Sequence, residues 1–249
     1  TVDLSAVLGS PQVVLRFDGI AGTVTAGGGI DPGYRSDIAL DDISITAAPL
    51  VTLTAGNGAL TMADNSAVDG GDSDVSLSAD GNITVNSITT TSDVVLTSDS
   101  GEIRDRSTTP DITGNTVTFN GDVMPGLGGA GSLEVSGDLT LGAGQILTVD
   151  IGGATAGTDY DQIVLTGNGD LSGSTLAVSL GTFIPPTNSV YTIVLNDTAS
   201  DAVTGRFTNA PNDGDIVTAS DGTTKFRVFY SANDGNDVML VEATPLDTL

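Results

Sequence analysis

Short runs of alternating apolar and polar residues recur along this chain, separated by turns rich in Gly, Asn and Asp. Residues 51–62 are VTLTAGNGALTM, residues 75–85 are VSLSADGNITV and residues 94–105 are VVLTSDSGEIRD. A partial copy, VTFN, occupies residues 117–120. Alternation with a period of two is typical of β-strands, and Gly, Asn and Asp favour the turns between them. The pattern predicts an all-β protein.

The spacing of the repeats, about 20 residues, is typical of stacked β-structures. One repeat cannot bury its inward residues alone, so each needs a neighbour above and below it. We therefore expect a parallel β-helix (solenoid), in which strands stack about 4.8 Å apart. Two sets of equivalent residues are expected to lie over one another. The first is Val51, Val75, Val94 and Val117, and the second is Leu53, Leu77, Leu96 and Phe119.

The first 48 residues carry two further expected strands, VVLRF at 13–17 and DIALDDISIT at 37–46. Alternation slips at Asp41-Asp42, which predicts a bulge or a bend. The stretch from TVDLSAVLGSPQVVLRF to YRSDIALDDISIT resembles the C-terminal half of a MAM-like jelly-roll domain. The resemblance implies a partial jelly-roll sheet in residues 1–48. Its missing strands would come from residues before Thr1 or from another chain.

The last part of the chain has longer alternating runs, such as LEVSGDLTLGAGQILTVDIGG at 133–153. Turn residues at Pro185–Asn188 and Asn233–Asp237 predict hairpins, and hence some antiparallel pairing near the end as a cap. This part resembles the C-terminal β-solenoid segments of autotransporter passengers. Residues 51–120 are similar to the repeats of filamentous haemagglutinins, which are bacterial surface proteins.

These patterns divide the chain into three expected units. They are a partial MAM-like jelly-roll unit at 1–48, β-solenoid repeats at 49–132, and an autotransporter-like solenoid or cap region at 133–249. The chain starts at Thr1 and shows no signal-peptide pattern, as expected of a mature or excised piece of a longer protein.

Charge and composition narrow the function classes. The chain has 32 acidic and 7 basic residues, a formal net charge of −25, and no Cys or His. Such a surface repels nucleic acids and anionic membranes, so no nucleic-acid partner is expected. The absence of a long apolar run predicts no membrane insertion. Without Cys and His the chain has no disulfide, no zinc finger and no Ser-His-Asp triad.

Calcium is the candidate cofactor, because this ion takes oxygen ligands from tight Gly-containing loops. SANDGNDVMLV at 231–241 resembles a single copy of a calcium-binding nonapeptide repeat. Its candidate ligands are Asn233, Asp234, Asn236 and Asp237. Asp41 and Asp42 are a weaker pair. The alternative is that Asn-Asp-Gly-Asn forms an ordinary hairpin turn.

A glycan site is the second candidate, because sugars stack on exposed aromatic rings. Aromatic residues make up only 4% of the chain, and there is no Trp. Tyr34, with Arg35 beside it, is the best candidate. The other tyrosines, Tyr160, Tyr191 and Tyr230, are expected to pack in the core or at a sheet edge.

No catalytic residue is expected, and we predict that the chain is not an enzyme. The Asp residues that stand in Gly, Asn or Ser contexts are expected to cap turns. They are Asp72, Asp74, Asp80, Asp99, Asp213 and Asp221.

The favoured hypothesis is an extracellular structural protein of the bacterial cell surface. It would be an adhesin segment or a self-assembling fibre subunit that exchanges strands with its neighbours. Its partners would be copies of itself or other surface proteins. A surface module that binds calcium or glycans is the alternative, and a polysaccharide-cleaving β-helix enzyme ranks third.

Overall fold

The computed structural model of the protein describes residues 13–17, 38–40, 43–44, 50–106, 111–197 and 200–243. These residues form strands, turns and loops, and the described part of the chain contains no helix. Accordingly, it has no helical segment of the length and apolarity needed to cross a membrane. The prediction of an all-β protein is confirmed.

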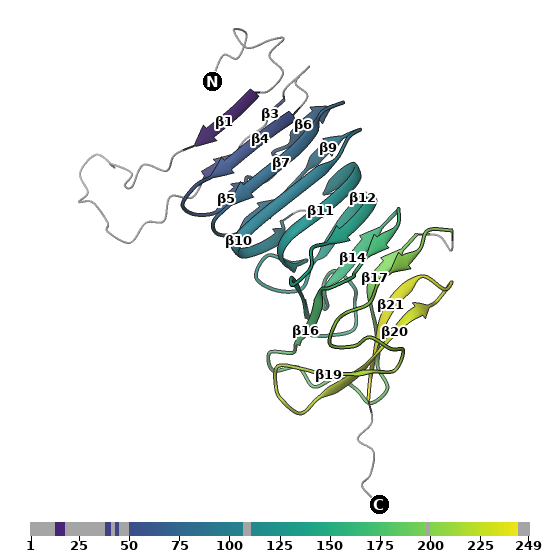
Figure 1. Ribbon diagram of the computed structural model, residues 1–249. Helices are drawn as coiled ribbons and strands as arrows, with labels where there is room; N and C mark the ends of the chain where they lie inside the picture. Colours follow the sequence, from purple (N-terminus) through teal and green to yellow (C-terminus); the bar gives the residue numbers. More distant parts are fainter. Residues whose placement is uncertain are drawn as a thin grey trace, which may run out of the picture.

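Most strands lie in three columns, within which neighbours pair in parallel (Figure 1). Column A contains β1 (Val13–Phe17), β4 (Leu50–Ala55), β7 (Asp74–Ala79), and parts of β10 (Val94–Asp105), β11 (Ile112–Met124) and β12 (Ser132–Leu141). It ends with β15 (Gly169–Asp170) and β18 (Val203–Thr204).

The other two columns are built in the same way. Column B contains β2 (Ile38–Leu40), β5 (Leu60–Met62), β8 (Ile83–Val85), the ends of β10 and β11, β13 (Ile146–Asp150) and β16 (Thr175–Ser179). Column C contains β3 (Ile43–Ser44), β6 (Val68–Gly71), β9 (Ile88–Thr90), the starts of β11 and β12, β14 (Gln162–Leu165) and β17 (Val190–Asn196). From β1 to β17 the chain visits columns A, B and C in this order, again and again. We call each stretch that runs once through A, B and C a passage.

The register within column A agrees with the prediction residue by residue. Val75 lies opposite both Val51 and Val94, and Val94 lies opposite Val117. The second set pairs in the same way, in the order Leu53, Leu77, Leu96 and Phe119. All eight side chains have 0% exposure, so the positions that repeat in the sequence form the core.

β10, β11 and β12 are long because each continues around a corner from one column into the next. In β10 the pairing with β11 shifts between Thr97 and Glu102, where Gly101 lies. A Cβ atom on Gly101 would lie 2.4 Å from the backbone nitrogen of Asn82 and 2.5 Å from the carbonyl carbon of Gly81. The passages therefore approach too closely at this corner for any side chain.

The first 48 residues contribute strands to the same columns. β1, β2 and β3 pair in parallel with β4, β5 and β6, and Val13 lies opposite Val51. A jelly roll is built from antiparallel strands, so these three pairings are not jelly-roll pairings. The rest of residues 1–48 lies outside the described part of the chain, and the partial jelly roll stays a prediction.

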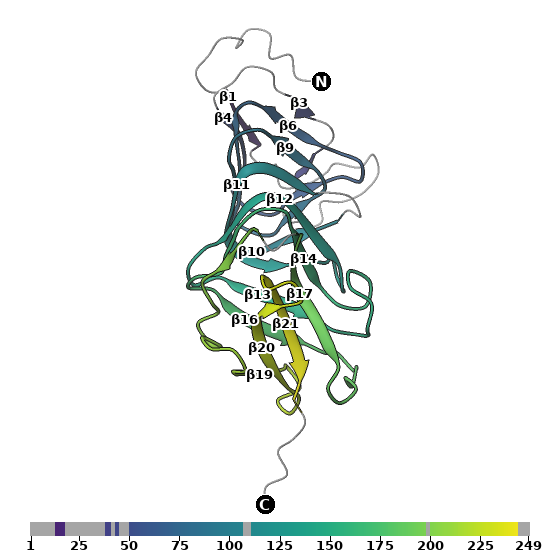
Figure 2. The same cartoon turned by 90° about the vertical axis from the view of Figure 1, so that its right-hand side faces the viewer.

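The C-terminal end differs from the rest in the direction of its strands. β21 (Asp237–Glu242) pairs antiparallel with β17 and with β20 (Lys225–Ala232), which pairs antiparallel with β19 (Ile216–Thr218). We call these four strands the cap sheet; they lie at the end of the molecule opposite β1 (Figure 2). The hairpin predicted at Asn233–Asp237 is confirmed, because Ala232 lies opposite Asp237.

The hairpin predicted at Pro185–Asn188 is wrong. A tight turn is present, in which Ser189 N donates to Pro186 O at 2.9 Å and Asn188 has a φ of 61°. However, it joins β16 to β17, which pair with different columns rather than with each other. Turn chemistry identified the turn, but could not identify the partners of the strands on either side.

Candidate functional site

The corner between columns B and C carries two loops with clefts between them. Residues 125–131 join β11 to β12, and residues 151–161 join β13 to β14. Two adjoining clefts, of about 430 and 370 Å³, lie between these loops and share Ala130 and Thr158 in their walls. We call this region the B–C corner. It is the best candidate for a binding site, because two hollows here open beside charged side chains.

The larger cleft is lined by acidic side chains and one arginine. Asp105 is buried, Glu134 is half-buried, and Arg106 lies beside them. Arg106 Nη1 donates to Asp64 Oδ1 at 2.8 Å, so its charge is already paired. Leu127, which is 46% exposed, adds an apolar edge. This lining suits a hydroxyl-rich or cationic ligand rather than an anion.

The smaller cleft has Asp150 and Asp159 in its wall. Asp159 Oδ2 accepts a hydrogen bond from Thr155 N at 3.0 Å. Hydrogen bonds from the Thr155 side chain and backbone lower the pKa of Asp159. This carboxylate is therefore ionised and engaged in holding its own loop.

Asp161 lies behind the two loops and fastens both of them. Its side chain accepts hydrogen bonds from Gly131 N at 2.7 Å and from Asp150 N at 2.8 Å, and it has 0% exposure. Burial raises the pKa of Asp161 to about 7, partly opposed by the two amide donors. A hydrolase needs a raised-pKa carboxyl that reaches substrate. Asp161 is enclosed and both its oxygens are engaged, so it does not meet this need.

The predicted glycan pair, Tyr34 and Arg35, lies outside the described residues, as do Asp41 and Asp42. These candidates stay predictions. The other tyrosines pack as expected: Tyr160, Tyr191 and Tyr230 are 7%, 1% and 4% exposed. Tyr160 and Tyr191 meet edge to face, with ring centroids 5.2 Å apart.

The predicted calcium loop at Asn233–Asp237 is a hairpin turn whose side chains bond within the protein. Asp237 accepts hydrogen bonds from Asn233 Nδ2 and, at 2.8 Å, from Asn196 N. Asn236 Nδ2 donates to Asp201 O at 2.6 Å, while Asp234 is exposed. Within the described ranges no three His, Cys, Asp or Glu side chains gather to hold a metal ion. Calcium binding at this loop stays a prediction.

Of the predicted turn aspartates, Asp221 caps its own turn, whereas Asp74 bonds to a neighbouring passage. Asp74 Oδ1 accepts a hydrogen bond from Asp93 N at 3.2 Å, across adjacent passages. Asp221 accepts hydrogen bonds from the backbone nitrogens and hydroxyls of Thr223 and Thr224, and these bonds lower its pKa. The bond that Asp74 makes between passages has two counterparts. Asp93 accepts a hydrogen bond from Thr116 N, and Asp138 accepts one from Asn168 N. Asp74, Asp93 and Asp138 therefore hold neighbouring passages together.

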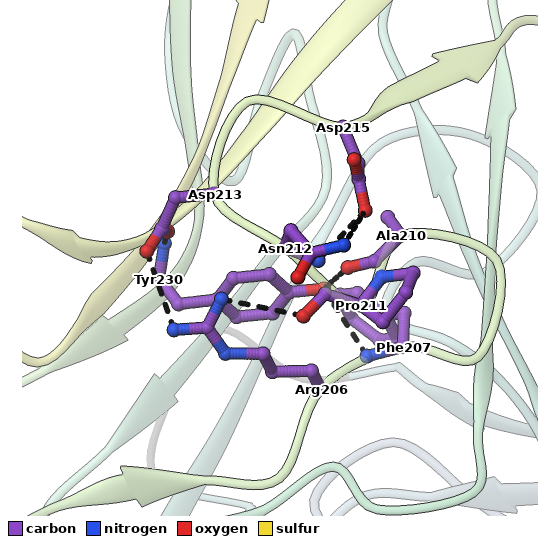
Figure 3. A network of polar contacts seen from close by, with 8 residues as sticks. All are labelled: Arg206, Phe207, Ala210, Pro211, Asn212, Asp213, Asp215 and Tyr230. Atoms are coloured by element: carbon purple, nitrogen blue, oxygen red, sulfur yellow. Dashed lines mark hydrogen bonds and ion pairs between the residues drawn. The ribbon is translucent and has the colours of Figure 1, made fainter.

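A polar network around Tyr230 of β20 holds the loop between β18 and β19 (Figure 3). The Tyr230 hydroxyl donates to Ala210 O at 2.6 Å and accepts from Phe207 N at 3.1 Å. The Arg206 guanidinium lies 4.8 Å from the centre of the Tyr230 ring and pairs with Asp213 at 3.2 Å. Burial raises the pKa of Tyr230 to about 12, so the hydroxyl stays protonated. This network fixes the loop against β20, and no sequence motif predicts it.

Comparison with known proteins does not assign the chain to a family. No protein-family model matches its sequence, and no curated protein matches it either.

Proposed function

We propose that this chain is a structural segment of the cell exterior: a β-solenoid rod that serves in a surface adhesin or as a fibre subunit. The observation that carries the proposal is the three-column register. From β4 to β17 each passage repeats the order A, B, C, with apolar residues inward. A parallel β-helix closed by the cap sheet accounts for this order.

The use of polar residues supports the same proposal. The repeated aspartates bond to backbone groups of the next passage, as Asp93 does with Thr116 and Asp138 with Asn168. The side chains of these aspartates therefore stabilise the stack of passages. A surface with a net charge of −25 suits a soluble protein outside the cell. The resemblance to haemagglutinin-type and autotransporter-type repeats points in the same direction.

The solenoid part of the proposal is tested by removing one passage. Deleting residues 75–93 takes out β7, β8 and β9 and brings Val94 opposite Val51. The shortened chain is expected to fold and to unfold cooperatively, because the neighbours on both sides keep their register. Deleting residues 75–84, about half of a passage, is the control and is expected to abolish folding. Equal behaviour of the two deletions would contradict the solenoid.

The location is tested separately, by labelling intact producing cells with antibodies raised against the chain. The proposal predicts labelling without permeabilisation and loss of the epitope when intact cells are treated with protease. Labelling only after the cells are opened would overturn it.

The B–C corner favours a second candidate function, a surface module that binds a hydroxyl-rich or cationic ligand. Its support is the larger cleft beside Asp105 and Glu134. Titration calorimetry with neutral oligosaccharides, and separately with calcium, tests it on the wild-type chain and on Glu134→Gln. Heat that is lost in the variant would favour the module, and absence of heat with both ligands would remove it.

A further inference from the structure

The outer face of the cap sheet is unusually apolar. Val190, Val241, Arg227 and Ile216 lie opposite one another across β17, β21, β20 and β19. Residues directly opposite in adjacent strands point to the same side of a sheet. The next row on this side is Thr192, Met239 and Phe229. Val190 is 51% exposed and Ile216 is 40% exposed, and the other members are half-buried.

The opposite side of the same sheet is the core. Tyr191, Leu240 and Val228 lie opposite one another between the two outer rows, and their exposures are 1%, 0% and 0%. The inner side therefore forms the core of the sheet, whereas the outer apolar residues stay exposed or half-buried.

The charges on this face are the reverse of those on the whole chain. Arg227 and Lys225 lie on it, since Lys225 is opposite Thr218 and two residues before Arg227. None of the residues named on the two outer rows is Asp or Glu, although the chain has 32 of these. In the described part of the chain the ion pairs involve Arg104, Arg106 and Arg206. Lys225 and Arg227 have no carboxylate partner among them, although Arg227 Nη1 donates to Gly214 O at 3.1 Å.

We propose that this outer face is an interaction surface that binds the acidic flank of a second copy of the same chain. The acidic flank is the corner at which column C continues into column A, and its exposed carboxylates are Asp69, Asp72, Asp74 and Asp93. Charge complementarity favours a second copy as the partner. The outer face carries two cations, and the rest of the same chain presents an acidic surface that matches them. At physiological ionic strength charges are screened beyond about 8 Å, so the contacting charges outweigh repulsion between the two copies as wholes.

The contact is head to tail. If two copies met through the same face, Lys225 and Arg227 would approach their own counterparts, which costs free energy. A contact between two different surfaces does not close on itself and produces open rows of subunits. This inference rests on the proposed function and specifies how fibre subunits would join, through side chains rather than through exchanged strands.

Sedimentation velocity of the full chain in 0.15 M NaCl tests the proposal. Wild-type protein is expected to form species larger than a dimer as its concentration rises. The double variant Lys225→Glu, Arg227→Glu is expected to associate at least tenfold more weakly, and Ile216→Ser to weaken association as well. Arg227→Lys keeps the charge and should associate like wild type. Ile184→Ser, which alters an 85% exposed residue outside the two rows, is the matched control.

Mixing distinguishes the two geometries. The charge-reversed variant keeps its acidic flank, so it should join the end of a wild-type row and shorten the rows. Wild-type protein that stays monomeric, or a charge-reversed variant that associates equally well, would overturn the proposal. A wild-type dimer that grows no further and excludes the variant would also overturn it. The antibody labelling of intact cells tests the proposed function separately, whatever the result of these association experiments.

Discussion

Residues 50–124 and residues 132–243 use the same kind of strand but are stabilised differently. In the first region successive passages stack like residue on like residue, as at Leu77 between Leu53 and Leu96. In the second region the loops lengthen and an edge-to-face chain of rings, Tyr160, Tyr191 and Phe226, fills the interior. Repetition alone therefore builds the first region, whereas the second needs contacts that do not repeat.

The two regions also differ at their surfaces. The large hydrophobic residues that are exposed in the described chain all lie in the second region or in the joint before it. They are Leu127, Ile146, Ile184, Val190, Leu195 and Ile216. The regular region thus buries its apolar residues almost completely, and the irregular region is where the molecule can contact others.

The largest expected effect is in the regular region. Phe119→Ala empties the column beneath Leu96 and should lower the free energy of unfolding by about 3–5 kcal/mol, because a large cavity forms at a fully buried site. Thr118→Ala, on the outer side of the same strand, is the control and should cost much less. Denaturant unfolding measures both. Similar losses would mean that the column is not the core.

The next effect is in the irregular region and depends on pH. Asp161 titrates near 7 when folded and near 3.8 when unfolded, so the folded state binds the proton more tightly. Its contribution to stability is complete below about pH 4 and is lost as the pH rises through about 7. Relative to Asp161→Asn, the wild type should lose on the order of 3 kcal/mol between pH 4 and pH 8.

Urea unfolding of both proteins across this pH range measures the difference. Asp234→Asn, at an exposed position, is the matched control and should follow the wild type. Parallel pH profiles for the wild type and Asp161→Asn would show that burial does not raise the pKa of Asp161.

A smaller effect is expected at a corner of the regular region. Gly101→Ala places a methyl group against backbone atoms of the previous passage, which cannot move aside, and should cost about 1–3 kcal/mol. Gly56→Ala is matched to it, because no atom lies within 4 Å of the added methyl. Melting temperatures that fall equally in the two variants would contradict the close approach.

The smallest effect is expected at the polar network around Tyr230. Tyr230→Phe removes the hydroxyl that joins Ala210 O and Phe207 N, and should cost about 1–2 kcal/mol because both backbone groups lose a partner. Tyr191→Phe is the comparison, since its hydroxyl bonds only to the Ser189 side chain among the contacts described. A loss confined to Tyr191→Phe would contradict the role of the network in Figure 3.

The sequence predicts the structure of the regular region better than that of the irregular region. The V-x-[LF]-x pattern predicted the column A register because stacking requires equivalent residues at equivalent places. The same pattern occurs in VVLR at 13–16, but that stretch was interpreted through the jelly-roll resemblance. Its pairing of Val13 with Val51 could have been found from the pattern alone.

The sequence does not predict the B–C corner. Nothing in the stretch TDYDQ distinguishes Asp161 from Asp159, yet one is enclosed and the other caps an exposed turn. The difference depends on which loop lies next to each carboxylate, and loop neighbours are set by the stack. The cap sheet was predicted only through its turn at Asn233–Asp237, because turn chemistry is local.

The central claim is that adjacent passages stack in the register observed here. The chain has no Cys, so pairs can be introduced without interference. Thr54 and Ser78 lie opposite each other in adjacent strands of column A and are both half-buried. The variant Thr54→Cys, Ser78→Cys should form a disulfide rapidly in the folded protein, because neighbouring strands are about 4.8 Å apart. The offset pair Thr54→Cys, Ser76→Cys should not, since its Cα atoms are about 8 Å apart. Equal cross-linking of the two pairs, or preference for the offset pair, would contradict the stack.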